Sequence, residues 1–140
     1  MICFPDVNVW VALAVAEHIH HAAAQEWLDT GEGRVAFCRI TQMGLLRLLT
    51  NRSALGSDTF SVADAWGAFD EFLRNRRISM SEEPPGLEDQ WRTATMRERN
   101  GSNWWTDIYL GAFASAAGFT LVTFNAQLAA RKNVRTHLLK

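Results

Sequence analysis

Two carboxylates and two side-chain amides stand where apolar, strand-like runs end or where helical runs begin. Asp6 follows the first apolar run and Asp107 opens a late helical run, while Gln42 lies in the first turn of an expected helix and Asn125 follows another apolar run. Because the carboxyl ends of parallel strands open onto one crevice, we expect these side chains to meet there. One or two carboxylates, together with waters and substrate phosphate oxygens, suffice to hold Mg²⁺. The pattern therefore indicates metal-dependent chemistry.

Each of the four side chains also has a purely structural interpretation. Asp6 is suited to cap the helix that follows it, and Asp107 sits where an acid favours the helix dipole. Asn125 is suited to cap the short turn at 126–130. The structural interpretation of Gln42 is an exposed polar residue. The metal hypothesis therefore rests on the combination of the four residues and not on any single one.

The elements that would position these residues alternate between strand and helix. Runs of β-type residues predict strands at 2–5, 34–37, 77–80, 119–122 and 134–139. Helical periodicity predicts helices at 7–16, 20–28, 40–51 with Thr41 as its N-cap, 61–74, 87–99 and 106–117. Residues 56–58 and 100–102 are expected to be a loop and a turn, and Gly118 is expected to end the last helix. Such alternation indicates an α/β fold with a mostly parallel, roughly five-stranded sheet.

Composition agrees with one globular domain spanning residues 1–140. The chain is 48% hydrophobic and 21% charged, carries a net charge of −1, and has no apolar stretch of membrane-spanning length. It shows no basic leader at its start, and Cys3 and Cys38 are interpreted as buried free thiols, so a cytoplasmic protein is expected. Twelve of its fourteen basic residues are Arg, and three clusters of basic residues lie at 74–77, 92–99 and 131–135. These clusters are suited either to phosphate or to ordinary solvated helix faces.

Several familiar chemistries are excluded by missing motifs. The sequence contains no Gly-x-Gly-x-x-Gly after its first strand, no Gly-Lys-Ser/Thr loop, no Cys-x-x-Cys, no His-Glu-x-x-His and no serine nucleophile elbow. His18 and His21 are three residues apart but have no third ligand nearby, so capping or surface roles are expected. A flavodoxin-like nucleotide-binding domain shares the alternation of elements but lacks a phosphate loop.

Five segments in order resemble the PIN-domain ribonucleases and, within them, the VapC-type toxins of toxin–antitoxin pairs. The segments are Phe-Pro-Asp-Val-Asn-Val-Trp from Phe4, His18-x-His-His with the following Ala-rich stretch to Leu28, Cys-Arg-Ile-Thr-Gln from Cys38 to Arg47, Thr-Asp-Ile-Tyr-Leu from Thr106, and Gly-Phe-Thr-Leu-Val-Thr-Phe-Asn from Gly118. The resemblance covers almost the whole chain. It implies a three-layer α/β/α sandwich, often dimeric, that cuts RNA with Mg²⁺ or Mn²⁺ and is paired with an antitoxin protein.

The resemblance also implies roles for individual residues. Asp6 and Asp107 match acids that hold the metal, whereas Gln42 and Asn125 stand where the family pattern has Glu and Asp. Each of these two departures removes a negative charge, so weaker metal binding is expected. Asn8 and Thr123 match polar positions of the family that orient metal ligands and water. Arg47 also matches the family, and it is suited to bind RNA phosphate or to form a structural ion pair.

Aromatic residues suggest two surfaces. Trp105 precedes Asp107 closely enough that its ring is a candidate for stacking on an RNA base. The helix at 61–74 carries an apolar stripe formed by Val62, Trp66, Phe69 and Leu73. That stripe is expected to face a second copy of the chain or an antitoxin helix, or else to pack against the helix at 87–99.

The leading hypothesis is a Mg²⁺- or Mn²⁺-dependent endoribonuclease toxin in which Asp6, Asp107, Asn125 and Gln42 form the catalytic set. RNA, an antitoxin and a second copy are the expected partners. The alternative is a PIN-fold protein with weakened catalysis that binds RNA or an antitoxin-like partner without cutting.

Overall fold

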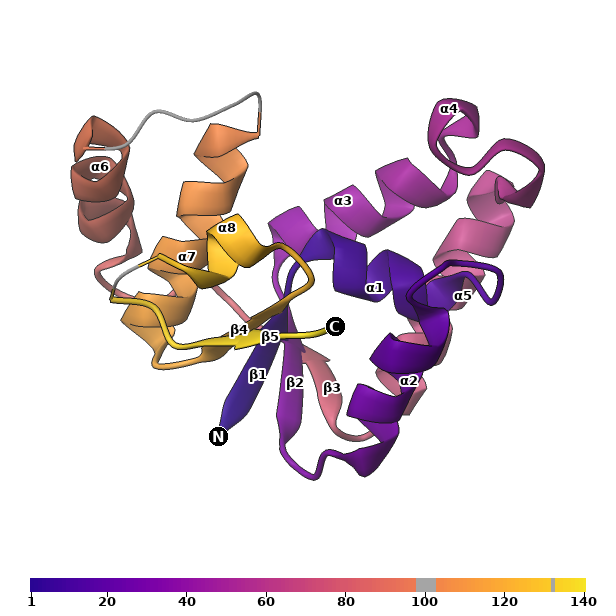
Figure 1. Ribbon diagram of the computed structural model, residues 1–140, viewed down its shortest axis with the longest axis horizontal. Helices are drawn as coiled ribbons and strands as arrows, with labels where there is room; N and C mark the ends of the chain where they lie inside the picture. Colours follow the sequence, from indigo (N-terminus) through magenta and orange to yellow (C-terminus); the bar gives the residue numbers. More distant parts are fainter. Residues whose placement is uncertain (98–102, 132) are drawn as a thin grey trace.

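Five parallel strands form the centre of the protein in the order β3-β2-β1-β4-β5 (Figure 1). The computed structural model describes residues 1–97, 103–131 and 133–140. The strands are β1 (Ile2–Pro5), β2 (Arg34–Phe37), β3 (Ile78–Met80), β4 (Thr120–Thr123) and β5 (Thr136–Leu138). The strand pairs β1–β2, β1–β4, β2–β3 and β4–β5 are all parallel. The expected five-stranded α/β architecture is therefore confirmed.

Helices cover both faces of this sheet, which makes three layers. The helices are α1 (Val7–Ala14), α2 (His21–Thr30), α3 (Arg39–Leu49), α4 (Arg52–Leu55), α5 (Val62–Arg74), α6 (Leu87–Arg97), α7 (Trp104–Ala117) and α8 (Ala126–Ala129). In Figure 1, α1 to α5 lie on one side of the sheet and α6 and α7 on the other. Each side has its own hydrophobic core, because a parallel sheet must be covered on both faces.

The apolar patterns explain where these elements pack. The central strand residues Phe4, Leu121 and Val122 are fully buried, as expected for strands with neighbours on both faces. Trp10 of α1 stacks on Phe37 of β2, with ring centroids 3.6 Å apart. Helix α7 is apolar around almost its whole circumference and is buried from Ile108 to Ala114, so it forms the main support on the second face.

The strand ends were predicted closely, and several helix ends were not. Helix α1 ends at Ala14, two residues early, and α7 begins at Trp104, two residues before the expected start. Thr41 does not cap α3: Cys38 occupies the N-cap position, and the Thr41 hydroxyl accepts a hydrogen bond from the Cys38 amide at 2.9 Å. Residues 56–58 form a 3₁₀ turn instead of an irregular loop. The turn expected at 100–102 lies outside the described residues.

Gly118 ends α7 in the left-handed conformation with φ of 73°, as expected for a glycine after a helix. The chain then enters β4 directly, so this turn fixes the direction in which β4 runs toward Thr123. Along the described parts of the chain, no helix combines the length and the apolar character needed to cross a bilayer.

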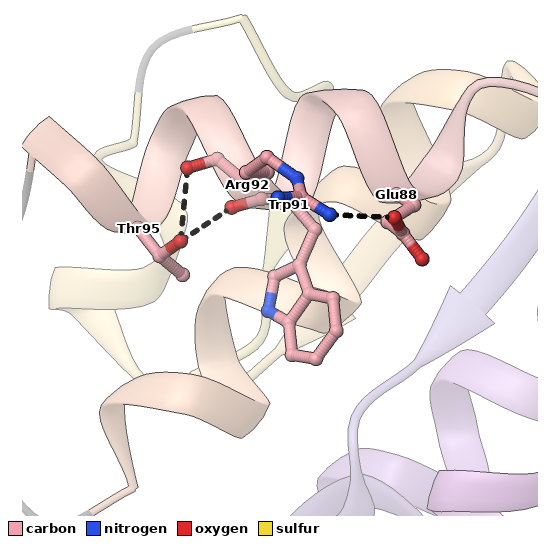
Figure 2. A network of polar contacts seen from close by, with 4 residues as sticks. All are labelled: Glu88, Trp91, Arg92 and Thr95. Carbon is pink, nitrogen blue, oxygen red and sulfur yellow. Dashed lines mark hydrogen bonds and ion pairs between the residues drawn. The ribbon is translucent and has the colours of Figure 1, made fainter.

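Three residues of the first two Arg clusters, Arg74, Arg77 and Arg92, have structural partners. Arg92 pairs with Glu88 along α6, with 2.8 Å between Nη2 and Oε2. The Thr95 hydroxyl donates back to the carbonyls of Trp91 and Arg92 (Figure 2). Arg74 pairs with Glu71 on α5, and Arg77 donates to the carbonyls of Leu28 and Gly33. Arg99 and Lys132, which belong to the predicted clusters, lie outside the described residues. These contacts favour the interpretation as ordinary helix faces for α5 and α6.

Candidate metal and RNA site at the carboxyl edge of the sheet

Asp6 lies at the carboxyl end of β1, where it is 6% exposed and tied to both neighbouring elements. Its amide donates to the Val122 carbonyl of β4 at 2.9 Å. One carboxylate oxygen, Oδ1, accepts the Val9 amide at 3.2 Å and so caps α1, as the structural interpretation expected. The other oxygen, Oδ2, accepts the hydroxyl of Thr123. Asp6 is therefore both a helix cap and a buried carboxylate at the sheet edge.

Burial makes the charged form of Asp6 costly. Desolvation raises the pKa of this carboxyl from its ordinary 3.8 to about 6, and the negative charge of Asp107 adds to the increase. The hydrogen bonds from Thr123 and Val9 act in the opposite direction and lower the pKa. The ion pairs Arg74–Glu71 on α5 and Arg92–Glu88 on α6 do not involve this carboxylate. A buried anion in this state would be stabilised by a bound cation.

Asp107 approaches the same place from the first turn of α7. Its carboxylate is partly buried, and desolvation raises its pKa, while the positive charge of Arg131 lowers it. Asp107 also contributes to the shift at Asp6, so the two carboxylates interact although they are far apart in sequence. The structure thus brings together the two acids that the sequence singled out. Arg131, near α8, is a site residue that the sequence analysis did not single out individually.

The segment after β4 connects Asp6 to Asn125. The fully buried Thr123 hydroxyl donates to Asp6 and accepts the Asn125 amide at 2.9 Å. The Asn125 side-chain oxygen accepts the amides of Gln127 and Leu128 at 2.9 and 3.3 Å, so it caps α8. Thr123 therefore holds Asp6 in place, and the side-chain oxygen of Asn125 is occupied by the cap that the structural interpretation expected.

Gln42 comes to this edge on the first turn of α3. The first turn of α1 packs closely against the second turn of α3, since a Cβ added to Gly44 would lie 2.6 Å from Cγ2 of Val7, the residue after Asp6. Gln42 is only 6% exposed, which contradicts its interpretation as an exposed polar residue. Its Oε1 accepts a hydrogen bond from Nη1 of Arg39 at 2.6 Å. Arg39 is a second residue that the sequence analysis missed, because an Arg at the start of a helix has no distinctive pattern.

The other predicted site residues lie around this centre at different depths. The Asn8 backbone lies close enough to the Asp6 carboxylate to lower its pKa, and the residue itself is exposed. Trp105, 58% exposed, lies two residues before Asp107 and contacts the rings of Trp104 and Trp91. Arg47 is exposed in the last turn of α3, about 7.5 Å along the helix axis from Gln42. Along their helices, Trp105 is therefore two residues from the site residue Asp107, whereas Arg47 is five residues from the site residue Gln42.

The histidines have structural partners. Nδ1 of His21 lies 2.8 Å from the Ala12 carbonyl, and Nδ1 of His18 accepts the amide of His20 at 3.0 Å. The His20 ring stacks on Phe124, with ring centroids 4.4 Å apart. These contacts join the end of α1 to α2 and to the segment after β4, and His20, the N-cap residue of α2, makes no side-chain capping hydrogen bond.

The donor set fits a hard divalent ion that retains water. In the part of the chain that the structure describes, no three His, Cys, Asp or Glu side chains are arranged to hold a metal. A structural zinc site would need such a set, whereas Mg²⁺ is commonly held by one or two carboxylates plus waters and phosphate oxygens. Asp6 and Asp107 supply two carboxylates, which balance one divalent charge. The residues present therefore fit Mg²⁺ or Mn²⁺ and do not fit zinc.

Comparison with known proteins agrees with this geometry. The family model described as "PIN domain" matches residues 3–133. Ribonuclease VapC41 of Mycobacterium tuberculosis is 44% identical over 140 residues, covering 96% of each chain. Two solved structures share the fold, each at 19% identity and a TM-score of 0.71. One is VapBC2 from Rickettsia felis bound to a promoter DNA fragment, and the match covers 100% of both chains. The other is M. tuberculosis VapC20, a sarcin–ricin loop cleaving toxin, and the match covers 91% of this chain and 93% of that one. This chain therefore belongs to the PIN domain family, among its VapC-type members.

Proposed function

We propose that this protein is an endoribonuclease toxin that cleaves RNA with Mg²⁺ or Mn²⁺ bound by Asp6 and Asp107. The observation that carries the proposal is the pair of interacting carboxylates at the carboxyl edge of the sheet, one of them buried with its pKa raised to about 6. The names of the VapC relatives supply the reaction class. In this proposal one PIN-like domain spanning residues 1–140 carries the activity, and an RNA substrate implies action in the cytoplasm.

The residues of the site have distinct tasks in this proposal. When bound, the metal ion would lower the pKa of a water and neutralise charge on the phosphoryl group. Thr123 fixes the orientation of Asp6 through its hydroxyl, and Asn8 contributes its backbone amide to the same carboxylate. Asn125 and Gln42 belong to the catalytic set as weaker contributors, since the side-chain oxygen of each already accepts hydrogen bonds. Trp105 and Arg47 are proposed as contacts for the RNA.

Cleavage of RNA during titration with Mg²⁺ or Mn²⁺ tests the proposal. The wild type should cut only with the ion present, and Asp107→Asn should remove cleavage and weaken metal binding measured by calorimetry. Asp70→Asn, which changes an exposed carboxylate on α5, is the matched control and should retain both. Cleavage that continues in EDTA, or that survives Asp107→Asn undiminished, would contradict the assignment.

An antitoxin protein is the proposed partner, with homodimer formation as a second association. VapC-type relatives support the antitoxin, because solved neighbours of the same fold are VapBC complexes. On α5, Val62, Trp66 and Leu73 are exposed, with Trp66 47% exposed, while Phe69 is buried. The alternative packing of this stripe against 87–99 is wrong, since α5 contacts α3 and α6 packs on α7 across the sheet. Trp66→Glu should weaken dimer formation or antitoxin binding in light scattering while leaving the melting temperature unchanged.

A second candidate function has specific support. The Asn125 and Gln42 oxygens are engaged in a helix cap and in a contact with Arg39, so the site offers two carboxylates where the family pattern has four acids. A protein of this kind would bind RNA or an antitoxin-like partner with little cleavage. RNA binding without metal-dependent cleavage, at enzyme concentrations equal to substrate, would favour this alternative.

A further inference from the structure

Arg39 is held at the edge of the site by an uncharged partner. Its Nη1 donates to Gln42 Oε1 at 2.6 Å, and the two residues are three apart on α3, a spacing that places side chains on one helix face. Gln42 is almost fully buried, whereas Arg39 is exposed, so the amide anchors the inner side of a guanidinium whose outer side faces solvent. An amide fixes the position of the guanidinium without neutralising its charge.

This placement is unfavourable for the helix itself. The N-terminus of a helix carries a partial positive charge, so a cation in the first turn is repelled by it. Arg39 would, however, favour an anion in front of it, whereas the Ile40 and Thr41 amides of that turn already donate to the Cys38 sulfur. Since β2 pairs in parallel with β1 and α3 begins directly after Cys38, the start of α3 lies at the same edge of the sheet as Asp6, and that anion would lie beside the acidic pair.

RNA binding creates a need for such a cation. Asp6 and Asp107 repel the phosphates of the substrate, and an amide in place of Glu at position 42 removes one negative charge from the same edge. We propose that Arg39, positioned by Gln42, binds a backbone phosphate of single-stranded RNA next to the Asp6–Asp107 pair. This inference rests on the proposed function, and it assigns Gln42 the task of a positioning residue acting through Arg39.

The test measures RNA binding separately from cleavage. A fluorescein-labelled single-stranded RNA of mixed sequence is titrated in EDTA at several salt concentrations, with anisotropy as the readout. One lost phosphate contact should make the slope of log K against log salt less steep by about 0.7, with affinity falling by roughly threefold or more. Arg39→Ala should show both changes, and Arg39→Lys should retain the slope because it retains the charge.

Matched variants separate positioning from general electrostatics. Arg34→Ala removes an exposed Arg at the opposite end of β2 and should leave affinity and slope unchanged. Gln42→Met keeps the side-chain length but removes the acceptor; it should weaken binding, and it should have no further effect in the Arg39→Ala background. Melting temperatures identify any variant that fails to fold, and Arg39→Lys then carries the comparison.

The outcomes distinguish this inference from the proposed function. If Arg39→Ala binds RNA with the same affinity and the same salt slope as the wild type, the inference is overturned, even if the wild type cleaves RNA. Weakening by Arg39→Ala without any effect of Gln42→Met overturns the positioning role. Wild type that binds RNA but never cleaves it contradicts the proposed enzyme, while the slopes still decide the role of Arg39. Absence of RNA binding by the wild type overturns both.

Discussion

Replacing Asp6 by Asn should make the metal-free protein more stable at neutral pH. Burial raises the pKa of the Asp6 carboxyl from 3.8 to about 6. Between these two values the folded protein retains a proton that the unfolded chain has released, so the free energy of unfolding falls as pH rises. Above about pH 6 both states are ionised and the loss is complete. The pKa shift is about two units, and each unit corresponds to about 1.4 kcal/mol, so ionising Asp6 lowers the free energy of unfolding by at most about 3 kcal/mol.

Asn is a suitable probe because it has nearly the shape of a protonated Asp and caps helices equally well. At pH 4 the two proteins should therefore be similar in stability. At pH 7.5 in EDTA, Asp6→Asn should exceed the wild type by up to about 3 kcal/mol, or about 9 °C in melting temperature for a chain of this size. Urea denaturation at a series of pH values measures the difference directly, and Asp70→Asn serves as the exposed control.

Metal gives the same experiment a second readout. An ion that binds only the folded, deprotonated site stabilises the wild type by mass action, so Mg²⁺ should raise the wild-type melting temperature and leave that of Asp6→Asn unchanged. The wild-type response should weaken below about pH 6, where Asp6 takes up a proton. If Asp6→Asn is less stable than the wild type by the same amount at every pH, Asp6 is a structural cap and the electrostatic reasoning is refuted.

Two further substitutions probe how the site is held. Thr123→Val removes the hydroxyl that donates to Asp6; it should raise the Asp6 pKa further and weaken Mg²⁺ binding in calorimetry, and unchanged affinity would contradict the orienting role. Gly44→Ala places a Cβ 2.6 Å from Val7 Cγ2 and should cost about 1–3 kcal/mol in denaturant unfolding, with a loss of cleavage if the packing of α1 on α3 aligns the site. A fully active Gly44→Ala protein of normal stability would show that this close packing is not required.

Local patterns determined the alternation of strands and helices and the presence of acids at the sheet edge. The bounds of β1 and β2 agree with the expected 2–5 and 34–37, because β-type residues bounded by a break are encoded within a few positions. Asp6 was singled out because the carboxyl ends of parallel strands meet at one edge of the sheet whatever the details of packing, and Asp107 because it opens the helix that leads into β4. The cap roles of Asp6 and Asn125 are local as well, since each side chain accepts amides within three residues.

Only the tertiary structure decided which of these groups interact and how strongly. The hydrogen bond from Thr123 to Asp6 spans 117 residues, and the pKa of Asp6 depends on burial by segments from both halves of the chain. Helical periodicity showed that α5 has an apolar face, but it does not specify which helix contacts α5; α3 does so instead of α6, and Val62, Trp66 and Leu73 stay exposed. The contact of Arg39 with Gln42 was hidden for a similar reason: the sequence gives their spacing, while the burial that turns an amide into an anchor comes from the packing of α3 against α1.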